Sequence, residues 1–319
     1  MAPVCLLLRA STCIALLGVT SCAADPYDFG MAADAGADAS GRPAPGPTSS
    51  TPTPTAPVVI EPPTMATGCG AGEYYVGRVQ GQLLDFAGVP VRGANVTVCG
   101  SVCVPGVSGA DGRFEVRIER CFTGTTEYAH GAALGFDGQG QRTDLYLDFN
   151  PTNEARMGVV RIQRPLYLGA YAGAGAAPAP STSSAAMNLV DGLGFSLTLR
   201  PDTIEYPISA PDEVVRAVRV PLAKVPPYAG RAPSVVYAIS PADATLRSPA
   251  AVEFPNVSGL RPGAVVDIVA VGNHGTLGRP PVGVLDRIGS GHVSVDGRRV
   301  IADSGLRAFG TVGYRTVTP

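Results

Sequence analysis

The sequence predicts an all-β fold: two tandem β-sandwich domains after an apolar N-terminal segment and a disordered Pro/Ala/Thr-rich tether. The first observation behind this prediction is a hydrophobic period of two in many short segments, which is typical of half-buried strands. The second is that no segment of convincing length has the 3.6-residue period of an amphipathic helix. The third is the breaker content, with 40 glycines and 30 prolines in 319 residues, which separates the strand-like runs.

The apolar N-terminal segment ends at a cysteine preceded by small residues. Residues 10–20 are apolar or small, a length that fits the h-region of a signal peptide and is too short to span a bilayer. The sequence Val19-Thr20-Ser21-Cys22 resembles the lipobox of bacterial lipoproteins. The resemblance implies that residues 1–21 are a lipoprotein signal peptide. It also implies that acylated Cys22 begins the mature chain and attaches it to the membrane.

Two other interpretations of this segment stay open. One is an ordinary signal peptide cut near Ala23 or Ala24, in which Cys22 carries no lipid. The other is a retained membrane span, which would have to bury Arg9 at a cost of roughly 2.5–3.5 kcal/mol. Within the lipoprotein interpretation, Ala23 after the cysteine, rather than an aspartate, favours the outer membrane by the sorting rule of enteric lipoproteins. The predicted location is therefore the cell envelope, with the chain held by lipid.

A long polar segment follows the cysteine. Residues 22–67 consist mainly of Ala, Asp, Gly, Pro, Ser and Thr, and Val58-Val59-Ile60 is the one hydrophobic run among them. Such a segment cannot bury enough apolar surface to offset its conformational entropy, so we expect a disordered tether. A tether of this kind either lets the folded part meet something at a distance or is a simple spacer.

The first folded domain is expected over residues 68–164. Apolar and polar residues alternate in four segments there, and turn signals such as Ala110-Asp111-Gly112 separate them. The expected strands are Tyr75–Val79, Ala94–Val98, Phe114–Ile118 and Leu145–Phe149. In the third strand, Phe114, Val116 and Ile118 should face the core. Short strands at this spacing favour a β-sandwich.

Three motifs in this domain resemble those of the carboxypeptidase regulatory-like domain. They are Gly77-x-Val79, Gly88-x-Pro90-x-x-Gly93-Ala94-x-Val96 and Asp111-Gly112-x-Phe114. The resemblance implies a seven-stranded sandwich of the transthyretin (prealbumin) type, used as an accessory module without catalytic residues. The cysteines inserted into the pattern depart from the family.

Residues 165–186 are rich in Ala, Gly, Pro and Ser and are expected to form a linker or a large loop before a second sandwich at 187–319. Its expected strands are Phe195–Leu199, Val214–Val220, Val235–Ile239, Val252–Phe254, Val265–Val271, His292–Val295, Arg299–Ala302 and Phe309–Val317. The string Val252-x-Phe254-Pro255-Asn256, with Pro262-Gly263 and Asp296-Gly297 after it, resembles bacterial extracellular sandwich segments with ZU5-like character. That resemblance implies a fold and no function.

The chain has seven cysteines, and four of them fall in the first folded domain. Cys5 and Cys13 would leave with the signal peptide, and Cys22 would carry lipid. The remaining four are disulfide candidates: Cys69, Cys99, Cys103 and Cys121. An even number in an exported chain indicates two disulfides, with three possible connectivities, and a zinc site is the alternative. The short loop between Cys99 and Cys103 favours their pairing, with Cys69 bonded to Cys121.

The search for catalytic or metal-binding motifs finds little. No Gly-x-Ser-x-Gly elbow is present, because Gly106-Val107-Ser108-Gly109 has the wrong spacing. The three histidines, His130, His274 and His292, are scattered, and no His-Glu-x-x-His motif occurs. The loop Asp137–Gln141 with Asp144 offers carboxylates but lacks the closing glutamate of an EF-hand. We expect no enzyme, no catalytic residue, no cofactor and no metal.

The predicted function is that of a non-catalytic, lipid-anchored envelope protein that presents β-sandwich domains for binding or structural roles. Its partner would be an unknown envelope protein or polysaccharide. Nucleic acid is not expected as a partner, because a net charge of −2 gives no basic footprint for it. The alternative is a carbohydrate-binding accessory protein. Since the chain has no Trp, a sugar site would rest on tyrosines: Tyr167, Tyr171, Tyr228 and Tyr237.

Overall fold

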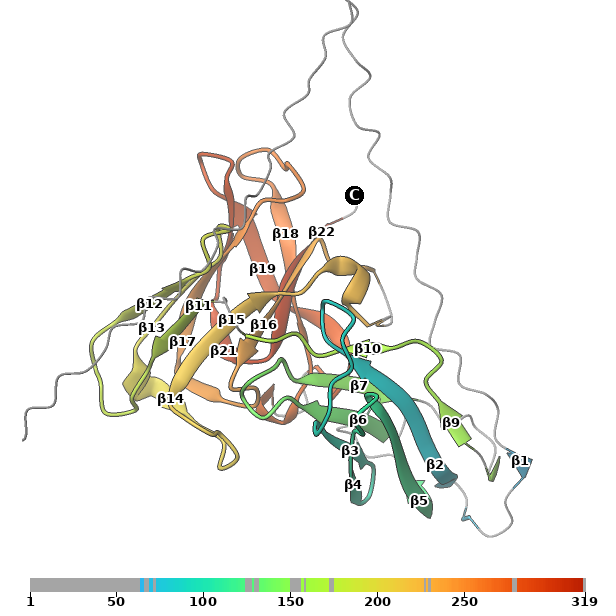
Figure 1. Cartoon of the computed structure of the whole chain (residues 1–319). Helices are drawn as coiled ribbons and strands as arrows, with labels where there is room; N and C mark the ends of the chain where they lie inside the picture. The colour runs from blue at the N-terminus through green and yellow to red at the C-terminus, as the bar shows by residue number, and fades with distance from the viewer. Residues whose placement is uncertain are drawn as a thin grey trace, which may run out of the picture. The chain divides into compact units, whose positions relative to one another are not determined.

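A computed structural model describes residues 64–65, 69–70, 73–123, 128, 132–149, 156–157, 159–171, 175–226, 228, 231–276 and 280–317 (Figure 1). All of them belong to one compact unit, Pro52–Pro319. Regular structure in these residues consists of strands and three 3-10 turns, so the predicted all-β class is confirmed. None of the described residues forms a helix long and apolar enough to cross a membrane. The predicted signal peptide, Cys22 and His130 lie outside the described residues.

Of the predicted tether at 22–67, the structure describes only Thr64 and Met65. They form β1 (Thr64–Met65), which pairs antiparallel with β8 (Arg156–Met157).

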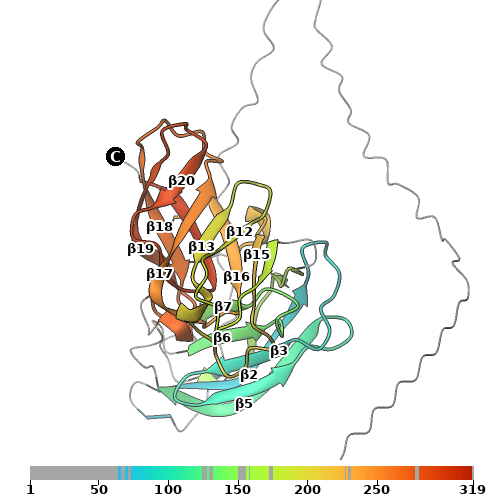
Figure 2. The same ribbon diagram turned by 90° about the vertical axis from the view of Figure 1, so that its left-hand side faces the viewer.

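The first half of the folded unit is a sandwich of two sheets (Figure 2). One sheet contains β2 (Glu73–Leu84), β5 (Arg113–Thr123), β9 (Val159–Arg161) and β10 (Leu166–Tyr167). The facing sheet has the order β4 (Cys103–Val107), β3 (Asn95–Cys99), β6 (Ala132–Asp137) and β7 (Leu145–Phe149). The period of two places one side of each strand in a shared core.

The core residues expected on β5 are confirmed. Phe114, Val116 and Ile118 are all buried, and the Phe114 ring meets the ring of Phe136 on β6 edge-on, with centroids 5.4 Å apart. At the start of this strand Gly112 has a φ of +73°, and a Cβ there would lie 2.2 Å from the Leu83 carbonyl oxygen. Only glycine permits that turn without strain.

The second half is a single twelve-stranded sheet that contains no cysteine. Its strands and turns are β11 (Gly175–Pro178), β12 (Met187–Val190), β13 (Ser196–Leu199), η1 (Pro201–Thr203), β14 (Ile204–Glu205), β15 (Val214–Arg219), η2 (Leu222–Lys224), β16 (Val235–Ser240), β17 (Thr245–Pro255), β18 (Val265–Val271), η3 (His274–Thr276), β19 (Leu285–Val293), β20 (Arg299–Ala302), β21 (Leu306–Ala308) and β22 (Thr311–Thr316). The main path runs β11-β15-β16-β22-β18-β19-β20-β17-β13-β12, and β14 and β21 pair with β17.

This sheet curls until its two end strands meet. A Cβ on Gly175 of β11 would lie 2.7 Å from the Val190 carbonyl oxygen of β12, so the ends of the path are in contact. The opposite walls enclose one hydrophobic core. At its centre the rings of Phe195 and Tyr237 stack with centroids 4.3 Å apart, and Phe254 packs at a tilt against both. Where two separate sheets were expected, one curled sheet supplies both walls.

Residues 165–186, expected to be a linker or loop, contribute two strands. β10 runs parallel to β2, and β11 pairs antiparallel with β15. Glycine in this segment marks close packing: a Cβ on Gly169 would lie 2.0 Å from the Phe86 ring. Composition predicts a linker or loop here, whereas its small side chains permit close packing against Phe86.

The two halves pack directly on each other. Tyr146 of β7 and Tyr228 join the cluster of Val269, Val271 and Leu285 on β18 and β19. A Cβ on Gly283 would lie 2.0 Å from the Asp148 amide nitrogen, so the backbones touch there. The folded unit is one body, and its two halves share buried surface.

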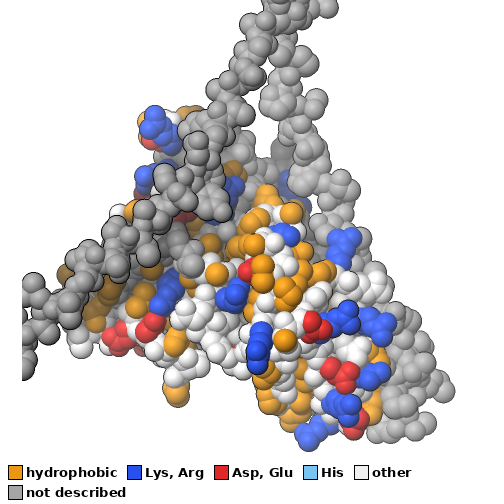
Figure 3. Space-filling model, viewed as in Figure 1, with side chains coloured by type: hydrophobic (Ala, Val, Ile, Leu, Met, Phe, Trp, Pro, Cys, Tyr) orange, Lys and Arg blue, Asp and Glu red, His pale blue; other side chains and the backbone are white. Residues whose placement is uncertain are grey.

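The surface carries charges of both signs. Figure 3 shows Lys and Arg side chains beside Asp and Glu on the visible face, without a single basic patch on that face. Ion pairs such as Arg78–Glu115 and Arg117–Glu115 are exposed. Exposed pairs of this kind contribute little stability, typically about 0–1 kcal/mol each.

Candidate functional site

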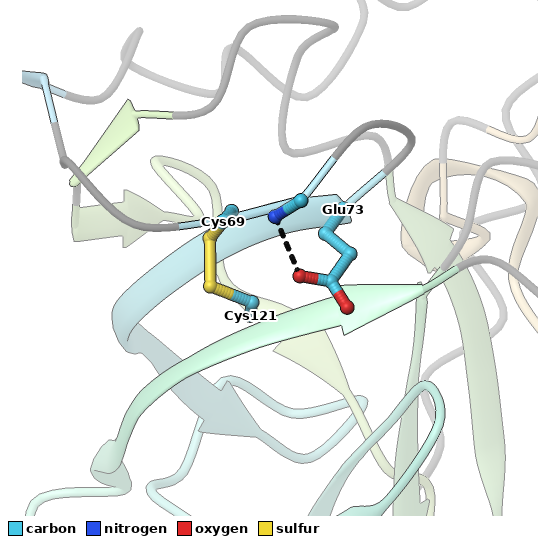
Figure 4. Close-up of a disulfide and its surroundings, with 4 residues drawn as sticks. Cys69, Glu73 and Cys121 are labelled. Atoms are coloured by element: carbon cyan, nitrogen blue, oxygen red, sulfur yellow. Dashed lines mark hydrogen bonds between the residues drawn. A yellow bond between two sulfur atoms is a disulfide. The ribbon is translucent and has the colours of Figure 1, made fainter.

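Disulfides join Cys69 to Cys121 and Cys99 to Cys103, the pairs that the sequence favours. Cys69, Glu73 and Cys121 are also the one group among the described residues with the spacing of metal ligands. The two sulfurs are bonded to each other, and the Glu73 carboxylate accepts the Gly70 amide N–H at 2.8 Å (Figure 4). This cluster therefore fastens the start of β2 to β5.

The candidate functional site is a half-open cavity of about 230 Å³ on the outer face of the β4-β3-β6-β7 sheet. Its lining comes from both halves of the folded unit. The residues are Thr97, Cys99, Cys103, Tyr128, Ala133, Gly135, Phe136, Asp137, Tyr146, His274 and Val282. We call it the Tyr146–His274 cavity.

Strand alternation produces the floor of this cavity. On β6, Leu134 and Phe136 belong to the sandwich core, so Ala133 and Gly135 face outward. Gly135 lies between Thr97 of β3 and Tyr146 of β7 in the ladder. Small residues in the central strand, flanked by larger ones, leave a hollow there.

The walls are aromatic and come from both halves. The rings of Tyr146 and His274 stand almost perpendicular, at 86° with centroids 5.6 Å apart, so they form a corner. Tyr128, which is buried, also lines the cavity. Val282 and the Cys99–Cys103 disulfide pack with these residues and close the remaining sides.

Asp243 fixes the corner. The Tyr146 hydroxyl donates to its Oδ2 at 2.6 Å, and the Gly275 amide N–H donates to its Oδ1 at 3.3 Å. A Cβ on Gly275 would lie 2.6 Å from the Asp243 carbonyl oxygen, so this approach requires glycine. One carboxylate thus orients the tyrosine of the first half and the histidine turn of the second.

Hydrogen bonds from the buried side chain of Asn273 position the turn that carries His274. Asn273 Oδ1 accepts the Thr276 amide N–H at 3.0 Å, and its Nδ2 donates to the Phe309 carbonyl at 2.6 Å. The turn therefore has a fixed position relative to β22, which follows Phe309.

The cavity lies in a region of negative potential. Burial, and then the neighbouring carboxylates Asp137 and Asp243, raise the pKa of Asp144 to about 7. Burial, and then Asp243 beside it, also raise the pKa of Tyr146 well above its ordinary value. Neither lysine nor arginine is among the residues that line the cavity. The charges around the cavity therefore favour a positively charged ligand.

The loop Asp137–Gln141 with Asp144, which offers carboxylates but is not expected to bind a metal, is a turn between β6 and β7. Asp137 Oδ1 accepts the Gln139 amide N–H at 2.6 Å, and Asp144 Oδ1 accepts the Gly138 amide N–H at 2.8 Å. Both carboxylates therefore stabilise the turn backbone. Asp137 lines the cavity as well, and its Oδ2 accepts a hydrogen bond from the side-chain Nδ2 of Asn95 at 3.3 Å.

The other residues weighed for chemistry have structural partners. Ser108 is buried, donates to the Val91 carbonyl at 2.7 Å and accepts the Ala94 amide N–H at 3.0 Å. It ties two chain segments of the sandwich together and does not face a general base.

His292 and a serine meet one exposed carboxylate. His292 Nδ1 lies 2.7 Å from Asp303 Oδ1, and the Ser290 hydroxyl donates to Asp303 Oδ2 at 2.7 Å. In a serine nucleophile the hydroxyl must pair with the imidazole. Here it pairs with the carboxylate, so the arrangement is a surface hydrogen-bond cluster.

The four tyrosines on which a sugar site would rest under the alternative function do not lie exposed side by side. Tyr171 and Tyr237 are buried, Tyr228 packs between the halves, and Tyr167 lies under the Lys224 ammonium at 4.0 Å. Of these four, Tyr171 lines a second cavity, beside Arg142 and Arg216. The tyrosines that line the Tyr146–His274 cavity are Tyr128 and Tyr146. The sequence carried no signal for them, because the second half builds the cavity around them.

Comparison with known proteins gives little. No protein-family model matches the chain, and no curated protein matches it. One crystal structure, of a Bacteroides uniformis protein provisionally described as carbohydrate-binding, aligns with 76% of this chain and 100% of its own. The two are 7% identical and the TM-score is 0.21, so neither the fold nor the binding of that protein carries over to this chain.

Proposed function

We propose that this chain is a non-catalytic, lipid-anchored binding protein of the cell envelope, which takes a small ligand or part of a partner into the Tyr146–His274 cavity. Acylated Cys22 would hold it to the membrane, with the outer membrane as the favoured location. A disordered tether would connect that anchor to the folded unit.

The observation that carries the proposal is the construction of the cavity. Residues from both halves converge on a hollow whose walls are fixed by hydrogen bonds to Asp243. Preformed concave sites lined by aromatic side chains and a few polar groups are typical of ligand binding. The two cysteines at its rim are joined in a disulfide, so neither offers a free thiol nucleophile. Binding is therefore favoured over catalysis.

We further propose that the first half is an accessory module of the carboxypeptidase regulatory-like type. In support, its two packed sheets bury the alternate residues of the motif strands, and Gly112 makes the turn that the motif requires.

The alternative is a carbohydrate-binding accessory protein of an envelope polysaccharide system. The Tyr146 ring, with Thr97 and Asp137 beside it, gives one aromatic surface and two hydrogen-bonding groups in the same cavity. Such a site would accept one sugar ring at a chain end.

The test uses tagged, full-length protein captured from cross-linked native envelopes. Wild type should be labelled by a clickable fatty acid and recover a stoichiometric protein or glycan partner. Cys22→Ala should lose the lipid label, and Gly135→Leu, which fills the cavity floor, should lose the partner. Glu119→Gln, an exposed change on β5, is the matched control. A lipid label that persists in Cys22→Ala, or a partner that persists in Gly135→Leu, would contradict the proposal.

A further inference from the structure

We infer that the Tyr146–His274 cavity binds a small organic ammonium group, either a quaternary ammonium of the choline type or the protonated amine of an amino sugar. This inference names the ligand class of the binding site proposed above and rests on that proposal.

The shape of the aromatic walls favours an organic cation. Cations bind over aromatic faces within about 6 Å of the ring centroid, and several rings set at angles surround a quaternary ammonium best. Tyr146 and His274 form such a corner at 86°, and Tyr128 lines the same hollow.

The floor of the cavity is apolar. Ala133 and Gly135 offer no side-chain hydrogen-bonding group, and Val282 adds an apolar wall. The methyl or methylene groups next to an ammonium nitrogen fit an apolar floor.

The charged groups at the cavity are carboxylates, which attract a cation. Asp137 lines the cavity, and Asp243 accepts the Tyr146 hydroxyl at 2.6 Å. A phenol that donates to a carboxylate has a more electron-rich ring, which strengthens its attraction for a cation. The described lining brings no lysine or arginine to oppose that field.

Size and donor type exclude other cations and larger ligands. The volume of about 230 Å³ lies below the range of about 300–1,000 Å³ for drug-sized ligands, so one headgroup or one ring fits. Calcium or magnesium would need six or more oxygen ligands. Both Asp137 oxygens already face amide donors, Gln139 N–H and Asn95 Nδ2.

The test is isothermal titration calorimetry of the full-length protein in detergent, at one ionic strength set with sodium chloride. Two ligand pairs isolate the charge: choline against its neutral isostere, in which carbon replaces the nitrogen, and glucosamine against glucose. We expect the ammonium member of at least one pair to bind about ten-fold tighter than its neutral partner. A preference within the first pair alone assigns a quaternary ammonium, and within the second alone an amino sugar.

Variants locate the preference. Asp137→Asn keeps the turn acceptor and removes the charge, so it should abolish the preference for the ammonium member. Gly135→Leu should abolish binding, while Glu119→Gln should bind as wild type does; circular dichroism and thermal melting establish that each variant is folded.

Equal binding within both pairs, no binding at all, or a preference that survives Asp137→Asn would overturn this inference. If the envelope partner is still lost in Gly135→Leu, the proposed binding function stands and only the ligand class is wrong. If Gly135→Leu still captures the envelope partner, both the ligand class and the proposed binding function are wrong.

Discussion

The two halves of the folded unit build stable β structure in different ways. Among the described residues, the first half is a small sandwich with a core of 20 buried residues and two disulfides, whereas the curled sheet of the second has a core of 26 and no cysteine. A small domain buries a smaller share of its apolar surface and commonly needs covalent crosslinks. The comparison indicates that the disulfides belong to the half with the smaller core.

The division also explains the candidate site. The disulfide-bonded sandwich of the first half supplies the floor of the cavity, with the Cys99–Cys103 disulfide at its rim. Turns of the curled sheet supply His274 and Val282 to the walls. A cavity of this kind requires both halves to keep their positions.

The largest effect is expected from Phe254→Ala. Phe254 is fully buried and packs against Phe195, Tyr237 and Tyr314 in the core of the curled sheet. The change should lower the free energy of unfolding by about 3–5 kcal/mol. The loss should be the same with and without reductant, as measured by urea unfolding. A loss that grows on reduction would show that the second half also depends on the disulfides.

Removal of the Cys69–Cys121 disulfide should destabilise mainly the first half. The bond closes a chain segment with a sequence separation of 52 residues, so Cys69→Ser with Cys121→Ser should cost roughly 4 kcal/mol. The matched pair Cys99→Ser with Cys103→Ser, at a separation of 4, should cost roughly 2 kcal/mol. Equal costs for both pairs would contradict the dependence on loop length. Equal destabilisation of both halves under reduction would contradict a stabilising role of the disulfides mainly in the first half.

Tyr146→Phe should weaken the contact between the halves. It removes the hydroxyl that donates to Asp243 Oδ2, and hydrogen bonds to charged groups are worth about 1.5–3 kcal/mol. The loss should appear in thermal unfolding of the full-length protein. Tyr75→Phe, an aromatic change on β2 away from this contact, is the control, and an equal effect there would argue against a role for Asp243.

The smallest effect is a pH dependence that Asp144 imposes. Burial raises the pKa of Asp144 to about 7 from an ordinary value near 3.8, so the folded state holds a proton that the unfolded chain has released. Stability is therefore highest below the ordinary pKa and falls as pH rises through 7. Between pH 6 and pH 8 the decrease should be about 1 kcal/mol.

Asp144→Asn should remove this part of the slope, measured by urea unfolding at several pH values. The matched variant Asp111→Asn changes an exposed carboxylate in a turn and should keep the wild-type slope. If Asp144→Asn left the slope unchanged, Asp144 would not hold a proton at neutral pH.

Local patterns in the sequence were sufficient to predict many of the strands. The expected strand Phe114–Ile118 lies within β5, and Val235–Ile239 lies within β16, because alternation or an apolar run between breakers marks each. β4 was missed since its sequence, Cys-Val-Pro-Gly-Val, contains two strand breakers, yet pairing with β3 through the Cys99–Cys103 register forms it.

Non-local packing explains the remaining differences. β6 is buried on both sides, so its sequence does not alternate and was not predicted. Part of its outer face packs against Val282 of the second half, a contact between residues far apart in the chain. The cavity has the same origin: Gly135 and His274 lie 139 positions apart by their residue numbers, and no sequence pattern links them.

The most direct measurement for the central claim, that one binding site is formed by both halves, is hydrogen–deuterium exchange of the full-length protein with and without saturating choline. We predict slower exchange in the cavity segments of both halves together, β3 and β6 on one side and residues 273–276 and 280–284 on the other. Slower exchange in only one half, or none in these segments, would contradict a site built by the two together.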